Sequence, residues 1–185
     1  SERRPAVTAE LMNTFRLLQK QKVAFAIIAG DMADRATRDE FEIFAAVAKA
    51  SDGLPIYGCV GNHDAYLSSS RPDMLDLLPS LFPGGKTNYV LNRPPLRFIV
   101  VNAAYWMMPE GKVGNIALGW SDVFPGSDSP GCGMGPEGIK WLHRTLAADT
   151  TTPTVIVSHF PFLFGPGEQT QCGYRLHAWM PIEHD

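Results

Sequence analysis

The segment "LPIYGCVGNHD" (Leu54–Asp64) decides how the sequence folds, because its character changes abruptly near its end. Its first part is a short, continuously apolar run, which is typical of a strand covered on both faces. The run ends in Asn62, His63 and Asp64, three adjacent side chains that bind metals or transfer protons. Burying such groups without partners is costly, so a purely structural interpretation of this strand end is poor. We therefore expect a strand that carries a functional site at its carboxyl end.

The residues before this segment predict the rest of a β–α–β unit. "VAFAIIAG" (Val23–Gly30) is a second short apolar run bounded by glycine, and "TRDEFEIFAAVAKA" (Thr37–Ala50) has helical periodicity with Thr37 and Glu40 as a capping box. An earlier helix is expected to begin after Thr8 as its N-cap. The apolar faces of the two predicted helices consist of Leu11, Met12, Phe15 and Leu18 in the first and Phe41, Phe44, Ala45 and Ala48 in the second. The order helix, strand, helix, strand favours a parallel sheet with a right-handed crossover.

The second half of the sequence predicts three more strands and two more helices. The strands are Thr87–Arg93, Leu96–Asn102 and the buried run Thr154–His159, and the helices are a short one within Asp73–Leu81 and one that opens at Pro136 and Glu137. Residues 103–135 are rich in Gly, Pro, Ser and Asp. A loop of this length is usually functional or mobile. Its large side chains either line a lid over the site or pack against the core: Trp106, Met107, Met108 and Trp120.

Three of the apolar strands share one peculiarity: a group that can bind a metal follows each of them. The first is followed by Asp31, the second by Asn62–Asp64 and the third by His159. The carboxyl ends of parallel strands lie at one edge of a sheet, which is where ligands bind. Oxygen and imidazole ligands suit Mn, Fe(II), Zn or Mg. The sequence therefore predicts a metal site at this edge.

These motifs and their order give the sequence a resemblance to a known family. "GDMAD" (Gly30–Asp34), "GNHD" (Gly61–Asp64) and "VSHFP" (Val157–Pro161) resemble the calcineurin-like metallophosphoesterases, or dinuclear metallophosphatases, whose pattern is D-x-H, GD, GNH[DE], a single His and GH-x-H. The resemblance extends from Val23 to about Pro161, and "PEGIKWLHRTLAA" (136–148) is similar to the family's helix before the last strand. It implies an α/β fold of two stacked β-sheets flanked by helices (αββα). It also implies hydrolysis of a phosphomonoester or phosphodiester by a metal-activated water.

The resemblance also assigns roles to individual residues. It implies that Asp31 bridges two divalent ions (Mn, Fe, Zn or Mg) and that Asn62 and His159 bind the second of them. His63 is implied to be catalytic: it lies above the phosphoryl group, where it stabilises charge or protonates the leaving oxygen. Asp64, the other catalytic residue, is expected to hold and polarise His63.

The family's first and last motifs do not occur in the sequence. Ser1–Ala6 contain neither aspartate nor histidine, and no GH-x-H is present, so of the first ion's ligands only Asp31 remains. Two explanations stand. In the first, which we favour, residues 1–185 form one domain that is incomplete at both ends, and the chain is expected either to self-associate or to be poorly stable. In the second, the protein is a degenerate member that acts as a binding or structural module without catalysis. Four other side chains are not expected to replace the missing ligands: His143, His177, His184 and Asp185.

Composition narrows the partners and the compartment. The 185 residues are 45% hydrophobic with a net charge of −3 and no dense Lys/Arg cluster, so we expect no nucleic acid as a partner. The partner that the resemblance implies is a small phosphate ester. The segment "SERRPAVTAELMN" (1–13) lacks the apolar part of a signal peptide, and no run reaches 18 apolar residues, so we expect no membrane association. Cys59, Cys132 and Cys172 are odd in number and far apart, which favours the cytoplasm.

Three other functional interpretations are disfavoured by the residues around the segments that suggest them. "GGKT" (Gly84–Thr87) lacks the first glycine of a phosphate-binding loop, because that position is Ser80. Ser158 has no G-x-S-x-G surroundings that would favour a serine hydrolase. Asp34 stands where purple acid phosphatases have a metal-binding tyrosine. A salt bridge of Asp34 with Arg35 is the expected structural role of this pair.

Overall fold

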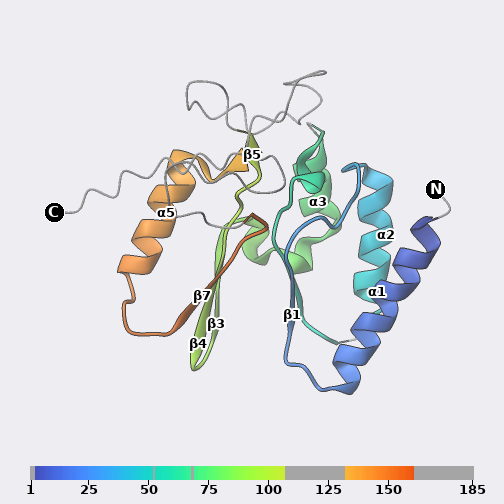
Figure 1. Ribbon diagram of the computed structural model, residues 1–185, viewed down its shortest axis with the longest axis horizontal. Coiled ribbons are helices and arrows are strands. Elements are labelled where there is room, and N and C mark those ends of the chain that lie inside the picture. Colours follow the sequence, from blue (N-terminus) through green and yellow to red (C-terminus); the bar gives the residue numbers. More distant parts are fainter. Residues whose placement is uncertain (1–2, 52, 68, 107–131, 161–185) are drawn as a thin grey trace.

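The computed structural model describes residues 3–51, 53–67, 69–106 and 132–160, and within them the strands lie between two groups of helices. Helices α1 (Arg3–Lys20) and α2 (Arg38–Lys49) lie side by side at one side of the molecule, and α5 (Gly135–Ala147) lies at the other (Figure 1). Helix α3 (Ser70–Leu77) packs against α2. This α/β arrangement of small sheets between helices agrees with the predicted fold class.

The first sheet is the predicted β–α–β unit. Strand β1 (Ala26–Ile28) pairs in parallel with β2 (Ile56–Gly58), and α2 forms the crossover between them. Glu40 caps the start of α2, because its carboxylate accepts the backbone N–H groups of Arg35 at 2.8 Å and Thr37 at 3.4 Å. The capping box is therefore confirmed. The predicted N-cap at Thr8 is wrong, because α1 begins at Arg3 and a proline in the first turn needs no N–H partner.

The second sheet has the order β3–β4–β7. Strand β3 (Tyr89–Arg93) is antiparallel to β4 (Leu96–Val100), as expected for neighbours, and β7 (Thr154–Val157) is parallel to β4. The prediction that β7 is buried is wrong, because Val155 and Ile156 are 41% and 38% exposed. Within the described sheet β7 pairs on one side only, and this edge position leaves its side chains open. A short third pair joins β5 (Tyr105–Trp106) to β6 (Cys132–Gly133).

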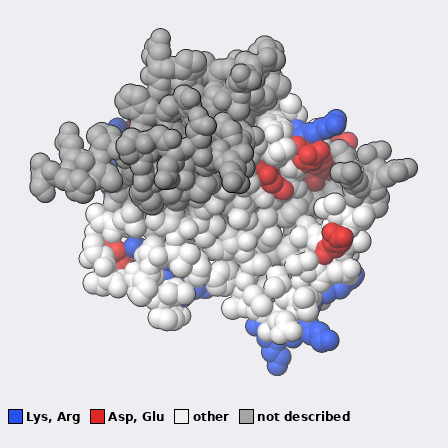
Figure 2. Space-filling view, viewed as in Figure 1, with Lys and Arg blue, Asp and Glu red and all other residues white. Residues whose placement is uncertain are grey.

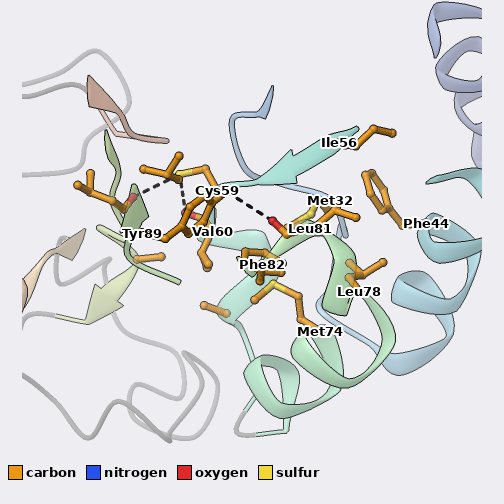
Figure 3. Close-up of a cluster of buried hydrophobic side chains, with 14 of the residues drawn as sticks. Met32, Phe44, Ile56, Cys59, Val60, Met74, Leu78, Leu81, Phe82 and Tyr89 are labelled. Atoms are coloured by element: carbon orange, nitrogen blue, oxygen red, sulfur yellow. Dashed lines mark hydrogen bonds between the residues drawn. The ribbon is translucent and has the colours of Figure 1, made fainter. Parts of the chain in front are cut away.

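The core fills the space around β2 and joins the two sheets near their ends. Phe82, Met74 and Leu78 pack under β2, and Tyr89 of the second sheet lies beside Cys59 (Figure 3). The Tyr89 hydroxyl donates to the carbonyl of Gly58 at 2.6 Å, and the Cys59 thiol donates to that of Val101 at 3.3 Å. Burial raises the pKa of the Cys59 thiol to about 12, so this cysteine is an inert packing residue.

Two further features concern the distribution of basic side chains and the lengths of the helices. On the face in Figure 2, the Lys and Arg side chains lie in separate groups near the margins rather than in one continuous stripe. Among the described helices, none is long and apolar enough to span a bilayer.

Candidate metal centre

The structure brings Asp31, Asn62 and His159 together, although they lie far apart in the sequence. His159 Nε2 lies 3.1 Å from Asn62 Oδ1 and 3.5 Å from Asp31 Oδ2. We expected the three residues at one edge of a single parallel sheet, and this detail is wrong. Asp31 and Asn62 follow strands of the first sheet, whereas His159 follows β7 of the second. The site therefore lies where the carboxyl ends of β1 and β2 meet the carboxyl end of β7.

The orientation of His159 makes this cluster a candidate cation site. His159 Nδ1 lies 2.8 Å from the carbonyl oxygen of Ala29, so Nδ1 carries a proton and donates it. In the neutral imidazole, Nε2 is then a bare acceptor that faces Asn62 Oδ1 and Asp31 Oδ2. Three acceptors that face one another repel unless a positive charge lies among them, and a carbonyl bond at the other nitrogen is the usual support of a metal-binding histidine.

The spacing of the three acceptors also suits one metal ion. Neighbouring ligands at octahedral bond lengths of about 2.1 Å lie about 3 Å apart, which is close to the distances found. The side chains of His159 and Asp31 remain 20% and 37% exposed, so an ion can enter. Among the residues that the structure describes, no group of three or more His, Cys, Asp and Glu gathers. The described donors therefore fit one ion and depend on the amide oxygen of Asn62.

Close contact of the strand ends depends on two glycines. Gly30 has φ +97°, and a Cβ there would lie 2.5 Å from His159 Nδ1 and 2.8 Å from the Cα of Gly61. A Cβ at Gly61 would lie 2.2 Å from Asp31 Oδ1. Asp31 itself has φ 56°, a left-handed conformation that is uncommon outside glycine and concentrates at functional sites. The backbone is therefore shaped to bring the carboxylate and the imidazole together.

Replacement of Gly30 with alanine tests this close approach. Gly30→Ala should weaken Mn²⁺ binding at least about tenfold, because loss of ligand orientation has costs of this size. It should also destabilise the fold by about 1–2 kcal/mol through the left-handed backbone alone. Gly53→Ala is the matched control, since Gly53 has φ +85° and nothing within 4 Å of a new Cβ. Calorimetric titration and thermal melts of the two variants separate strain from displacement, and equal Mn²⁺ affinity in both would contradict this role of Gly30.

Asp64 does not contact His63, and the expectation that it holds and polarises this histidine is wrong. Its carboxylate accepts backbone N–H groups from Asp31 at 2.9 Å, Ala33 at 3.0 Å and Gly61 at 2.9 Å. Both carboxylate oxygens of Asp64 thus accept hydrogen bonds, and the side chain is fully buried beneath the site. Burial raises the pKa of Asp64 to about 7, and the charge of Asp31 adds to this rise while the amide bonds oppose it. Asp64 therefore joins the loops that follow β1 and β2.

His63 is held by Asp34 and not by its sequence neighbour. Its Nδ1 lies 2.6 Å from the backbone carbonyl of Asp34 and 3.8 Å from the Asp34 carboxylate, and its Nε2 lies 3.1 Å from the Tyr66 hydroxyl. Its own backbone N–H donates to Asp31 Oδ1 at 3.1 Å. The expected Asp34–Arg35 ion pair is present but long, at 3.9 Å between exposed side chains. Sequence analysis missed Asp34 and Tyr66 as partners of His63, and the acidic residue three positions after Asp31 was the available signal.

Of the other candidate ligands, the structure describes His143 alone. His143 is exposed on α5. His177, His184 and Asp185 lie outside the described residues, as do Met107, Met108 and Trp120 of the long loop, and the side chain of Trp106 is not described either.

The fold and the site together define an α/β protein with a candidate metal centre at the carboxyl ends of its strands. The family model for calcineurin-like phosphoesterases matches residues 5–180 of the 185. The chain therefore belongs to the calcineurin-like phosphoesterase family, whose members are generally metal-dependent phosphoesterases. A search among curated proteins found no match.

Proposed function

We propose that this protein is a metal-dependent phosphoric ester hydrolase that acts on a small phosphomonoester or phosphodiester. The observation that carries the proposal is the convergence of Asp31, Asn62 and His159 in a member of this family. The donor set of carboxylate, amide and imidazole suits Mn, Fe, Zn or Mg. We further propose that two such ions bind, and Asp31 would be a ligand of both.

Each residue of the site has a distinct task under this proposal. When bound, a divalent ion would polarise a phosphoryl oxygen and lower the pKa of the water that attacks phosphorus. Asp31, Asn62 and His159 hold the ion. His63 is anchored through Nδ1 to the Asp34 carbonyl, and its Nε2 lies 3.1 Å from the hydroxyl of Tyr66. In the doubly protonated ring, Nε2 would donate to the phosphoryl group and protonate the leaving oxygen.

Removal of metal tests the proposal directly. Protein treated with a chelator and desalted should lose turnover of p-nitrophenyl phosphate and bis-p-nitrophenyl phosphate. Adding Mn²⁺, Zn²⁺ or Fe²⁺ should restore the turnover of at least one ester, and Ca²⁺ is a useful comparison because it prefers more ligands at longer distances. Turnover that is unchanged after metal is removed would contradict a metal-dependent reaction.

A second candidate is a binding module of the same fold without catalysis. It is favoured by the single set of three donors in the part of the chain that the structure describes, which suits one ion only. This alternative predicts one equivalent of bound metal and no turnover of either ester. Metal analysis and an ester assay on one sample therefore distinguish the two functions.

A further inference from the structure

Tyr66 lies between the catalytic candidate His63 and the ligand candidate Asn62. It follows the short 3₁₀ turn His63–Ala65, and its ring packs against that of His63 with centroids 4.6 Å apart. Its hydroxyl lies 3.1 Å from His63 Nε2 and 3.3 Å from Asn62 Nδ2. Neither the proposed metal-binding role of Asn62 nor the proposed catalytic role of His63 gives a function to the Tyr66 hydroxyl.

The direction of each hydrogen bond in this group follows from one fixed acceptor. The carbonyl oxygen of Asp34 only accepts, so the His63 Nδ1 at 2.6 Å carries a proton. In the neutral ring, His63 Nε2 is then an acceptor, and it takes the single proton of the Tyr66 hydroxyl. The phenolic oxygen is left to accept from Asn62, and only the Nδ2 amide group of Asn62 can donate to it.

This sequence of bonds decides which end of the Asn62 amide faces the metal site. With Nδ2 bound to Tyr66, Oδ1 points to His159 Nε2 at 3.1 Å. In the opposite orientation, Nδ2 would donate to His159 Nε2 and present an N–H group, which cannot bind a cation. The two amide orientations have the same shape, so only their hydrogen-bond partners select between them.

We propose that Tyr66 is a positioning residue that keeps the amide oxygen of Asn62 turned toward the metal. It does so through a series of hydrogen bonds that runs from Asn62 to Tyr66, from Tyr66 to His63, and from His63 to the carbonyl oxygen of Asp34. The inference rests on the proposed function for the identity of the site, and it adds a residue that touches neither metal nor substrate. Loss of a partner that orients a metal ligand typically weakens metal binding about 10–100-fold.

Removal of the hydroxyl in Tyr66→Phe is the central test. Mn²⁺ binding, measured by calorimetric titration, should weaken about 10–100-fold, and the protected side-chain amide signal of Asn62 in the NMR spectrum of the metal-free protein should be lost. Tyr57→Phe is the matched control, because the Tyr57 hydroxyl accepts a hydrogen bond from Arg93 of β3, so its loss should affect neither measurement. Unchanged affinity and an unchanged Asn62 signal in Tyr66→Phe would overturn the inference.

The variant Asn62→Asp separates orientation from a general structural effect. A carboxylate has oxygen at both ends and needs no partner to choose between them, so adding Tyr66→Phe to Asn62→Asp should cost almost no further Mn²⁺ affinity. An equal loss in both backgrounds would overturn the inference, because Tyr66 would then support the loop rather than the amide. The NMR signal requires neither metal nor turnover. An Asn62 signal that depends on Tyr66 in a protein that binds no metal would therefore refute the proposed function and leave this positioning role intact.

Discussion

Replacement of Asp31 with asparagine is expected to lower kcat/KM for a phosphate ester at least about 1,000-fold, which corresponds to about 4 kcal/mol of transition-state stabilisation. The change removes the only negative charge among the three acceptors and gives the ion an amide in its place. The fold should survive, because an amide oxygen can still accept the backbone N–H of His63 that Asp31 Oδ1 accepts at 3.1 Å.

Two measurements make the Asp31→Asn result specific. Mn²⁺ titration should show a large loss of affinity, whereas circular dichroism should show an unchanged spectrum. Asp39→Asn is the matched control, since it removes an exposed carboxylate from the first turn of α2. A variant that keeps wild-type Mn²⁺ affinity would show that Asp31 does not bind the ion.

Replacement of His63 with alanine should lower kcat about 100- to 10,000-fold without a comparable loss of metal affinity, because its imidazole transfers a proton rather than binding the ion. The loss should depend on the leaving group. Phenyl phosphate releases a more basic oxygen than p-nitrophenyl phosphate, so its hydrolysis needs the proton from His63 more and should slow by the larger factor.

The control for His63 is His143→Asn, which changes an exposed histidine on α5. It should leave both substrates unaffected. Equal losses for the two esters in His63→Ala would argue that His63 stabilises charge on the phosphoryl group rather than protonating the leaving oxygen.

Much of the fold was predictable because local patterns determine it. Short apolar runs predicted β1, β2, β3, β4 and β7, and the capping box located the start of α2. Periodicity does not reveal which strands share a sheet, because pairing depends on contacts between distant residues. The assignment of each strand to one of the two sheets, and the exposed edge position of β7, were therefore missed.

The site was predictable in its members and less so in their contacts. The positions of Asp31, Asn62 and His159 after three strands indicated that they meet, and the structure places them together. Adjacency in sequence misled the prediction for Asp64, because consecutive residues at a 3₁₀ turn point in different directions. The carboxylate of Asp64 turns inward to three amides, while His63 turns to a carbonyl 29 residues earlier.

The most direct measurement is a crystal structure of the protein grown with Mn²⁺, with anomalous-difference density recorded at a wavelength where manganese scatters strongly. A peak is expected about 2.0–2.3 Å from a carboxylate oxygen of Asp31, Oδ1 of Asn62 and Nε2 of His159. If manganese binds elsewhere, or if these three atoms turn away from one another, then the strand ends do not form a metal centre and the proposed chemistry has no site.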